Sequence, residues 1–205
     1  MDTNKQNQEV YLMNTLVVLA HPNSQSFNSA VAQTVKDELE KRGDEIKFKD
    51  LYAMNWNPVL SQADFEGFHN GKIPADLLAE QADVNWADVV IMIAPIWWTS
   101  VPAIMKGYID RVFSLGFAYE YTATGPRGKL GSKKGLLITT SGADEASANA
   151  NGMMASLKRT LMDGFFGFCG FSEYKHQNLF AVTIVKDTDR QQMLENIRGL
   201  IRSYT

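Results

Sequence analysis

Residues 15–28 read TLVVLAHPNSQSFN, and this stretch decides the fold class. Its first part, Thr15–Ala20, is an unbroken apolar run rich in β-branched residues, which is typical of a strand buried on both faces. Residues 21–25 form a polar loop. From Ser26 the apolar residues recur with the helical period, and Gly43 is placed to end that helix. A buried strand that leads through a short loop into a helix is the unit of an α/β fold.

The same alternation of strand and helix continues along the chain. The further strands that we predict are 46–48, Val89–Ala94, Gly135–Thr140 and Leu179–Val185, and the further helices are 74–84, Val101–Phe113, 152–167 and Thr188–Tyr204. Long loops are expected before residue 74 and at Gly125–Gly131. Five such units predict a doubly wound parallel sheet in the order 2-1-3-4-5, with helices on both faces. Its ligand site lies at the carboxyl ends of strands one and three.

Composition narrows the function classes. The chain has 205 residues, 45% of them hydrophobic, and a net charge of −3, so no basic surplus points to nucleic acid. A single cysteine excludes an internal disulfide and a C-x-x-C motif. No apolar run approaches the ~20 residues that span a bilayer. We therefore expect a cytoplasmic protein without membrane insertion, with a flexible tail at residues 1–14 and a single domain at residues 15–205.

Three turns at the carboxyl ends of predicted strands carry the candidate chemistry. The loop at 21–28 leads into a helix N-terminus, which suits a phosphate, although Ser24 or Ser26 could equally be a plain helix cap. The turn at 95–100 holds two tryptophans that could flank a flat ring or simply pack in the core. The turn at 139–143 has small residues that let a ligand approach the backbone. Because these turns follow neighbouring strands, together they describe a flavin site.

Other chemistry is poorly supported by the sequence. No G-x-G-x-x-G, Walker A or G-x-S-x-G pattern occurs, so a dinucleotide-binding Rossmann unit, a P-loop enzyme and a serine hydrolase are disfavoured. The three histidines, His21, His69 and His176, have no partners at metal spacing and are expected at the surface or at caps, so we expect no metal site. The acidic residues Asp64, Glu66, Asp144 and Glu145 are expected to be solvated loop charges.

Several longer segments resemble the flavodoxin-like NAD(P)H:quinone oxidoreductase family. They are DLYAMNWNP at 50–58, VPAIMKGYIDRVF at 101–113, GFAYEY at 116–121, SKKGLLITT at 132–140 and FCGF at 168–171. Together with the first loop they extend the resemblance over residues 15–190. It implies a flavodoxin-like fold, a flavin cofactor, NAD(P)H as electron donor, and two-electron reduction of a quinone or a similar aromatic acceptor. A ping-pong exchange is expected, in which both substrates use the flavin in turn.

The resemblance also assigns site residues by position. The implied cofactor-binding residues are His21, Ser26, Phe27, Asn28, Pro95, Ile96, Trp97, Trp98, Thr99, Thr139, Thr140, Ser141, Gly142 and Arg190. Arg190 matches an arginine at the adenosine end of FAD, which favours FAD over FMN. Tyr119 and Tyr121 match a tyrosine pair that reaches into the site of a partner chain, so a homodimer with interface sites is expected. These tyrosines and the Gly142 backbone are the implied catalytic groups.

One departure from the family pattern affects function. The animal enzymes carry a tyrosine and a histidine soon after the fourth strand, and residues 144–152 here hold neither. Two other readings stay open beside the oxidoreductase. One is a flavodoxin-type electron carrier, and the other is a regulatory subunit that senses flavin or nicotinamide without quinone turnover.

Overall fold

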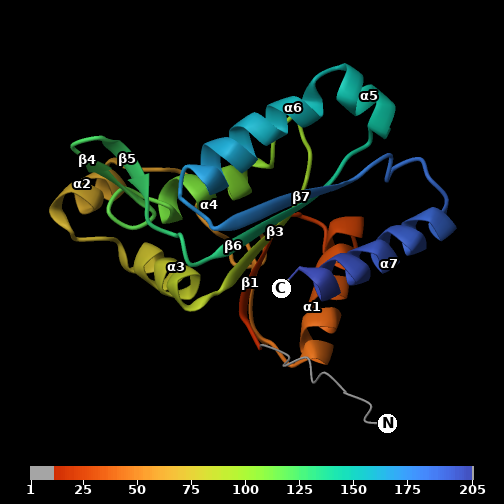
Figure 1. The fold of residues 1–205 in the computed structure, drawn as a ribbon, viewed down its shortest axis with the longest axis horizontal. Coiled ribbons are helices and arrows are strands. Elements are labelled where there is room, and N and C mark those ends of the chain that lie inside the picture. Colours follow the sequence, from red (N-terminus) through yellow and green to blue (C-terminus); the bar gives the residue numbers. More distant parts are fainter. Residues whose placement is uncertain (1–11, 205) are drawn as a thin grey trace, which may run out of the picture.

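A five-stranded parallel sheet forms the centre of the computed structural model, which describes residues 12–204 (Figure 1). Its strands are β1 (Asn14–Leu19), β2 (Glu45–Asp50), β3 (Val89–Pro95), β6 (Lys134–Thr140) and β7 (Glu173–Leu179). They lie in the order β2-β1-β3-β6-β7, and every neighbouring pair is parallel. Counted among the sheet strands alone, this is the order 2-1-3-4-5, so the predicted flavodoxin-like fold class is confirmed.

Helices cover both faces of this sheet (Figure 1). On one face, α1 (Phe27–Arg42) and α7 (Asp187–Ser203) pack beside each other. On the other face lie α3 (Ala75–Trp86), α4 (Ala103–Val112), α6 (Met153–Leu157) and the π-helical continuation η1 (Lys158–Gly167). Alternate residues of one strand enter different cores: Leu16 and Val18 face the α3–α4 side, and Val17 and Leu19 face α1 and α7. This two-sided burial is why β1 is apolar throughout.

The predicted end of α1 at Gly43 is confirmed, and of the two serines that could cap its start, Ser26 does so. Ser26 is the N-cap, and its hydroxyl accepts the Ser29 N–H at 3.1 Å. Gly43 follows the helix with φ at 91°, a left-handed conformation that glycine adopts without a steric penalty.

The prediction of the fifth strand at Leu179–Val185 is wrong. The strand is β7, which ends at Leu179, and the next residues form a turn with Ala181 at a φ of 56°. β7 pairs only with β6 at the edge of the sheet, so part of it faces solvent and its sequence, EYKHQNL, is mostly polar. The apolar run after it is a loop, not a strand.

Three further elements lie in segments that were expected to be loops. They are α2 (Gln62–Asn70), α5 (Glu145–Ala150) and β5 (Gly125–Gly128), which forms an antiparallel hairpin with β4 (Tyr119–Thr122). The signal for α2 is its capping box, in which Ser61 and Asp64 bond each other's backbone N–H. Asp144 is the N-cap of α5, where its carboxylate accepts the Ser147 N–H at 2.9 Å.

The predicted tail falls mostly outside the described residues. Residues 1–11 are not described, and β1 begins at Asn14, which the tail prediction had included. Within 12–204, no helix combines the length and the apolarity needed to cross a bilayer.

Two of the family-like segments, 50–58 and 101–113, pack against each other. A Cβ on Gly107 would lie 2.2 Å from the Pro58 carbonyl oxygen, so only glycine allows α4 to approach this closely. At the next residue of α4, the Tyr108 ring meets the Trp56 ring edge to face, with centroids 5.3 Å apart. The two segments therefore form one structural unit that anchors α4 beneath the loop that follows β2.

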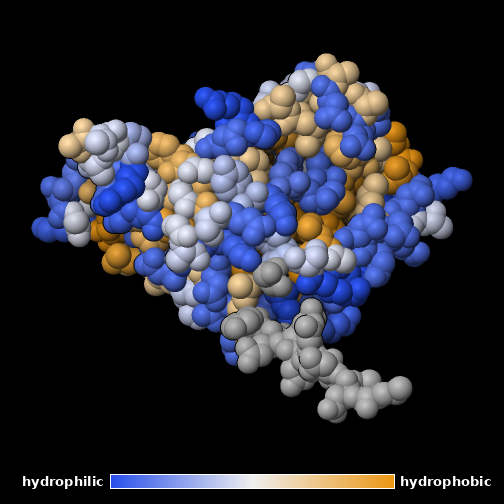
Figure 2. All heavy atoms as spheres, in the orientation of Figure 1, coloured by the Kyte–Doolittle hydropathy of each residue, from blue (hydrophilic) through white to orange (hydrophobic). Residues whose placement is uncertain are grey.

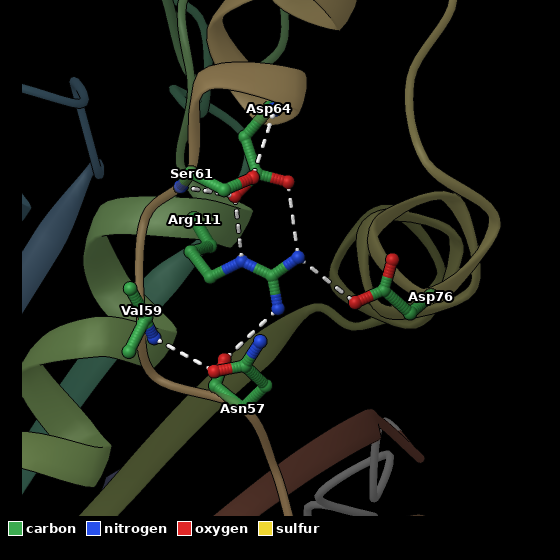
Figure 3. A network of polar contacts seen from close by, with 6 residues as sticks. All are labelled: Asn57, Val59, Ser61, Asp64, Asp76 and Arg111. Atoms are coloured by element: carbon green, nitrogen blue, oxygen red, sulfur yellow. Dashed lines mark hydrogen bonds and ion pairs between the residues drawn. The ribbon is translucent and has the colours of Figure 1, made fainter.

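A buried ion pair completes this contact (Figure 3). Arg111 of α4 makes two bonds of 3.0 Å to the Asp64 carboxylate, one of 2.9 Å to the Asn57 carbonyl oxygen, and one of 3.0 Å to Asp76. Asp64 is 1% exposed, so the expectation of a solvated loop charge is wrong for this residue. The Arg111 guanidinium, helped by Ser61, lowers the pKa of the Asp64 carboxyl below its usual value.

Replacing Asp64 with asparagine is expected to destabilise the protein by about 3 kcal/mol at pH 7, because Arg111 then keeps only the half-exposed Asp76 as a charged partner. The lowered pKa adds a pH dependence. Ionised Asp64 stabilises the fold above the unfolded-state pKa of about 3.9, and that stability is lost as the pH falls through the folded-state value. Urea unfolding at a series of pH values should therefore show that the free energy of unfolding falls less steeply toward acid pH in Asp64→Asn than in the wild type.

The matched control is Asp110→Asn, which breaks an exposed pair with Lys106 and should lower the free energy of unfolding by less than about 1 kcal/mol. Equal losses in the two variants would contradict the role of the buried pair.

Candidate functional site

The turns after β1, β3 and β6 meet in one pocket, which we call the switch-point pocket because the strand order reverses between β1 and β3. Its volume is about 350 Å³. It is lined by His21, Ser26, Phe27, Asn28, Pro95, Ile96, Trp97, Thr140, Ser141, Gly142, Val182 and Thr183. Ten of these residues were predicted from the sequence, and Val182 and Thr183 of the turn after β7 were not.

The loop after β1 is held in shape by its own polar side chains. The Asn23 N–H donates to His21 Nδ1 at 3.1 Å, and the Asn23 side-chain oxygen accepts the Gln25 N–H at 2.8 Å. The His21 ring lies 6.0 Å from the Trp97 ring, centroid to centroid, across the pocket wall. The loop's own side chains therefore hold its backbone in this shape.

The start of α1 leaves donors open toward the pocket. The Ser26 hydroxyl accepts the Ser29 N–H and the Ser26 carbonyl oxygen accepts the Ala30 N–H, but within the described residues the backbone N–H groups of Phe27 and Asn28 have no protein acceptor. These two groups stand at the positive end of a 16-residue helix. Free N–H groups and the helix dipole together favour an anion at this position.

Asn28 links the first and third turns of the pocket. Its Nδ2 donates to Thr140 Oγ1 at 2.9 Å, whereas its Oδ1 has no hydrogen-bond partner among residues 12–204. The side chain is 4% exposed. A buried acceptor without a partner costs about 1–3 kcal/mol. Because Asn28 is a lining residue of the pocket, a ligand donor that reached its Oδ1 would remove this cost.

The turn after β3 is strained. Trp97 and Ser100 exchange both backbone hydrogen bonds, at 2.9 and 3.1 Å, which leaves Trp98 and Thr99 with φ values of 52° and 58°. Tight turns of this type normally use Asn-Gly, and each residue held in this region costs of order 1–3 kcal/mol. The turn points Trp97 into the pocket and leaves Trp98 100% exposed.

The turn after β6 includes the residue Gly142, which lines the pocket and keeps a backbone donor that is free among the described residues. The Ser141 N–H is bound by the Leu179 carbonyl oxygen at 2.9 Å, so it is not available to a ligand. Within 12–204 the Gly142 N–H has no protein acceptor. Among the three residues of this turn that line the pocket, Thr140, Ser141 and Gly142, only Gly142 keeps a free N–H within residues 12–204.

A second cavity, which we call the hairpin pocket, lies between α4, β4 and η1. Its volume is about 500 Å³, and its wall includes Thr99, Phe113, Tyr119, Phe168 and Cys169. Burial raises the pKa of the Cys169 thiol to about 12, and it also raises the pKa of the Tyr119 hydroxyl. Both groups therefore keep their protons near neutral pH, and the thiol is a poor nucleophile.

Comparisons with known proteins agree with this geometry. The flavodoxin-like fold family matches residues 13–201. An uncharacterized NAD(P)H oxidoreductase from Haemophilus influenzae is 35% identical, over 89% of this chain and 91% of its own length. NAD(P)H dehydrogenase (quinone) 1 from Rattus norvegicus is 34% identical, over 88% and 73%. This chain belongs to the flavodoxin-like NAD(P)H:quinone oxidoreductase family.

A solved structure extends the likeness to three dimensions. The NAD(P)H:quinone oxidoreductase from Methanothermobacter marburgensis superposes with a TM-score of 0.86 at 26% identity, over 95% of this chain and 98% of its own. As a member of the quinone oxidoreductase family, the protein is an oxidoreductase of the NAD(P)H dehydrogenase (quinone) type.

Six of the site residues implied by the family resemblance lie outside the switch-point pocket. Thr99 and Tyr119 line the hairpin pocket, and Trp98 and Tyr121 are exposed. Thr139 is buried in β6 with its side chain turned away to His176 and Asn178. Arg190 lies beside the pocket, in the first turn of α7.

Two polar residues of this site were missed from the sequence. His176 was expected at the surface or at a cap, and Asn178 was not considered. Both lie on β7 and bond Thr139. Their spacing of two along a strand places them on one face of the sheet. That spacing becomes a signal only once β7 is correctly located.

Proposed function

We propose that this protein is a flavin-dependent NAD(P)H oxidoreductase that reduces a quinone-like acceptor by a ping-pong mechanism. The observation that carries the proposal is the switch-point pocket, where three turns bring together an open helix N-terminus, an aromatic wall and a free backbone donor. The names of the related enzymes support the same donor and acceptor.

The residues of the pocket fit a flavin. The N–H groups of Phe27 and Asn28 would bind a flavin phosphate, and the orphaned Asn28 Oδ1 would accept a hydroxyl of the ribityl chain. The Pro95–Trp97 segment would lie along the flat ring, with Trp97 as the aromatic contact. Each unmet group of the pocket therefore has a partner of the right polarity in this cofactor.

The bound flavin would supply the redox chemistry, taking a hydride from the nicotinamide and passing two electrons to the acceptor. The protein contributes electrostatics. The Gly142 N–H is the donor that would stabilise negative charge on the pyrimidine side of the reduced ring. Because no tyrosine or histidine follows β6 in residues 144–152, this fixed dipole takes the place of a side-chain acid.

Purified protein is expected to bind about one flavin per chain. NAD(P)H should bleach the flavin without oxygen, a quinone should restore its colour, and double-reciprocal plots should be parallel. Asn28→Leu should weaken flavin binding about ten-fold, the equivalent of one or two lost hydrogen bonds. The matched control is Gln33→Leu on the exposed face of the same helix. A protein that binds neither FMN nor FAD would overturn the proposal, and intersecting plots would overturn its ping-pong part.

We further propose FAD as the cofactor, with FMN as the alternative. Arg190 Nη1 donates to the Val182 carbonyl oxygen at 2.9 Å, and Val182 lines the pocket in the turn that follows β7. A cation there suits the second phosphate group that distinguishes FAD from FMN. Beyond it, hydrophobic residues gather over the loop between β7 and α7, where Ile184 is largely exposed (Figure 2). Such a surface fits an adenine ring.

Arg190→Ala is expected to lower FAD affinity by about 10- to 150-fold, the equivalent of a charged hydrogen bond of 1.5–3 kcal/mol. FMN affinity should change little, because FMN ends before this position. Arg198→Ala, two turns further along α7, removes the same charge away from the pocket and serves as the control. Fluorescence titration of both flavins with all three proteins measures the difference. An unchanged FAD-to-FMN ratio in Arg190→Ala would show that this arginine does not contact the cofactor.

The arrangement of the two tyrosines supports a homodimer. Tyr119 and Tyr121 lie on the β4–β5 hairpin, away from the switch-point pocket of their own chain, and Tyr121 is 69% exposed. Trp98 and Phe168 are also exposed near the hairpin pocket. Soluble monomers rarely leave such aromatic clusters uncovered. We propose that a second copy covers them and that the tyrosines complete the partner's site, as two-fold symmetry allows.

Light scattering should report twice the chain mass of 22.9 kDa. Tyr121→Ala is expected to raise the KM for quinone severalfold while the unfolding midpoint stays unchanged, because an exposed side chain contributes little to folding. Full turnover by a monomer at nanomolar concentration would show that one chain holds a complete site. The cytoplasmic location stays a prediction.

A further inference from the structure

His176 lies outside the switch-point pocket but is connected to it by four hydrogen bonds. Its Nε2 lies 2.7 Å from Thr139 Oγ1, which lies 2.7 Å from Asn178 Oδ1. Asn178 Nδ2 lies 3.0 Å from Ser141 Oγ, and Ser141 Oγ lies 3.1 Å from the Ala143 carbonyl oxygen. We call this series the β7 chain. It begins on the edge strand and ends in the turn that follows β6.

The direction of every bond follows from the last acceptor. A carbonyl oxygen only accepts, so the Ser141 hydroxyl donates its one hydrogen to Ala143. Ser141 Oγ must then accept from Asn178, which turns the Asn178 amide nitrogen toward Ser141 and its oxygen toward Thr139. Thr139 in turn donates its one hydrogen to that oxygen. It can only accept from His176, so His176 carries its proton on Nε2.

Burial makes this arrangement rigid. Thr139, Asn178 and Ser141 are all buried, so water cannot substitute for a missing partner. Desolvation lowers the pKa of His176 to about 4, which keeps the imidazole neutral with a single N–H. The neutral ring that donates to Thr139 therefore has its proton on Nε2 and none on Nδ1.

The β7 chain ends at the turn that carries the free Gly142 donor. Ser141 and Ala143 flank Gly142, and the Ala181 N–H also donates to the Ala143 carbonyl oxygen at 2.9 Å. We propose that His176 is a positioning residue, which acts through Thr139, Asn178 and Ser141 to aim the Gly142 N–H into the switch-point pocket. This inference rests on the proposed flavin function and adds a residue to it that never touches the ligand.

The ligand-free protein tests the chain directly. Nitrogen-15 NMR of the imidazole should show a proton on Nε2 of His176 and none on Nδ1. In His176→Leu, the amide resonance of Gly142 should shift, because Thr139 loses its donor and the turn relaxes. His176→Gln should restore it, since the glutamine Nε2 can donate from a similar position. Lys175→Gln, next to it on β7, is the control. A proton on Nδ1 of His176, or a Gly142 amide resonance that stays unchanged in His176→Leu, would overturn the proposal.

The flavin-bound protein tests the consequence. His176→Leu should lower the affinity for reduced flavin about ten-fold more than the affinity for oxidised flavin, which corresponds to a fall of about 30 mV in the two-electron midpoint potential. His176→Gln should keep the wild-type potential. A merely structural loss would weaken both flavin states equally and leave the potential unchanged, and that result would overturn the proposal.

A second pair of variants covers a failure of His176→Leu to fold. Thr139→Val removes the hydroxyl at nearly constant volume, and Thr139→Ser keeps it, so the first should reproduce the Gly142 shift and the second should not. If the wild-type protein binds no flavin, the proposed function fails, whereas the imidazole and Gly142 resonances of the ligand-free protein still decide the β7 chain.

Discussion

Backbone pairing of β3 with β1 on one side and β6 on the other is the constraint on which the rest of the structure depends. The Ala20 N–H donates to the Ile93 carbonyl oxygen at 2.9 Å, and the Ile96 N–H donates to the Thr140 carbonyl oxygen at 2.7 Å. These bonds extend the sheet pairing by one residue at the carboxyl end of each strand. Because these strands are parallel and aligned, the turns that follow them lie together at the carboxyl edge of the sheet. The switch-point pocket is the direct result.

The pocket combines satisfied and unsatisfied polar groups in a consistent pattern. The groups that shape it are hydrogen-bonded to one another, as in the His21 to Gln25 loop and the β7 chain. Two groups of residues that line it, the Asn28 Oδ1 and the Gly142 N–H, have no partner within residues 12–204. The strained Trp98–Thr99 pair lies on the same rim. Unmet bonds and strain concentrated at one edge, on an otherwise well-bonded frame, are characteristic of a preorganised ligand site.

The opposite side of the sheet is stabilised by a different kind of contact. The loop after β2 is held to α4 by the close approach of Gly107 to Pro58 and by the buried pair between Arg111 and Asp64. Since α4 also forms a wall of the hairpin pocket, this contact positions the surface that carries the exposed aromatic residues. The two family-like segments at 50–58 and 101–113 therefore occur together for a packing reason.

The sequence by itself determined the alternation of strands and helices, the end of α1 at Gly43 and the three turns that form the site, and it narrowed the cap of α1 to Ser24 or Ser26, because each depends on residues close together in the chain. It misplaced the fifth strand, because an edge strand is paired on one side only and lacks the apolar run of a central one. Only the tertiary structure decided that Thr140 faces the pocket and Thr139 the β7 chain, since neighbours on a strand point to opposite faces. The burial of Asp64 was likewise decided by the tertiary structure, because the positive charge that compensates its carboxylate comes from Arg111, 47 residues away in the sequence.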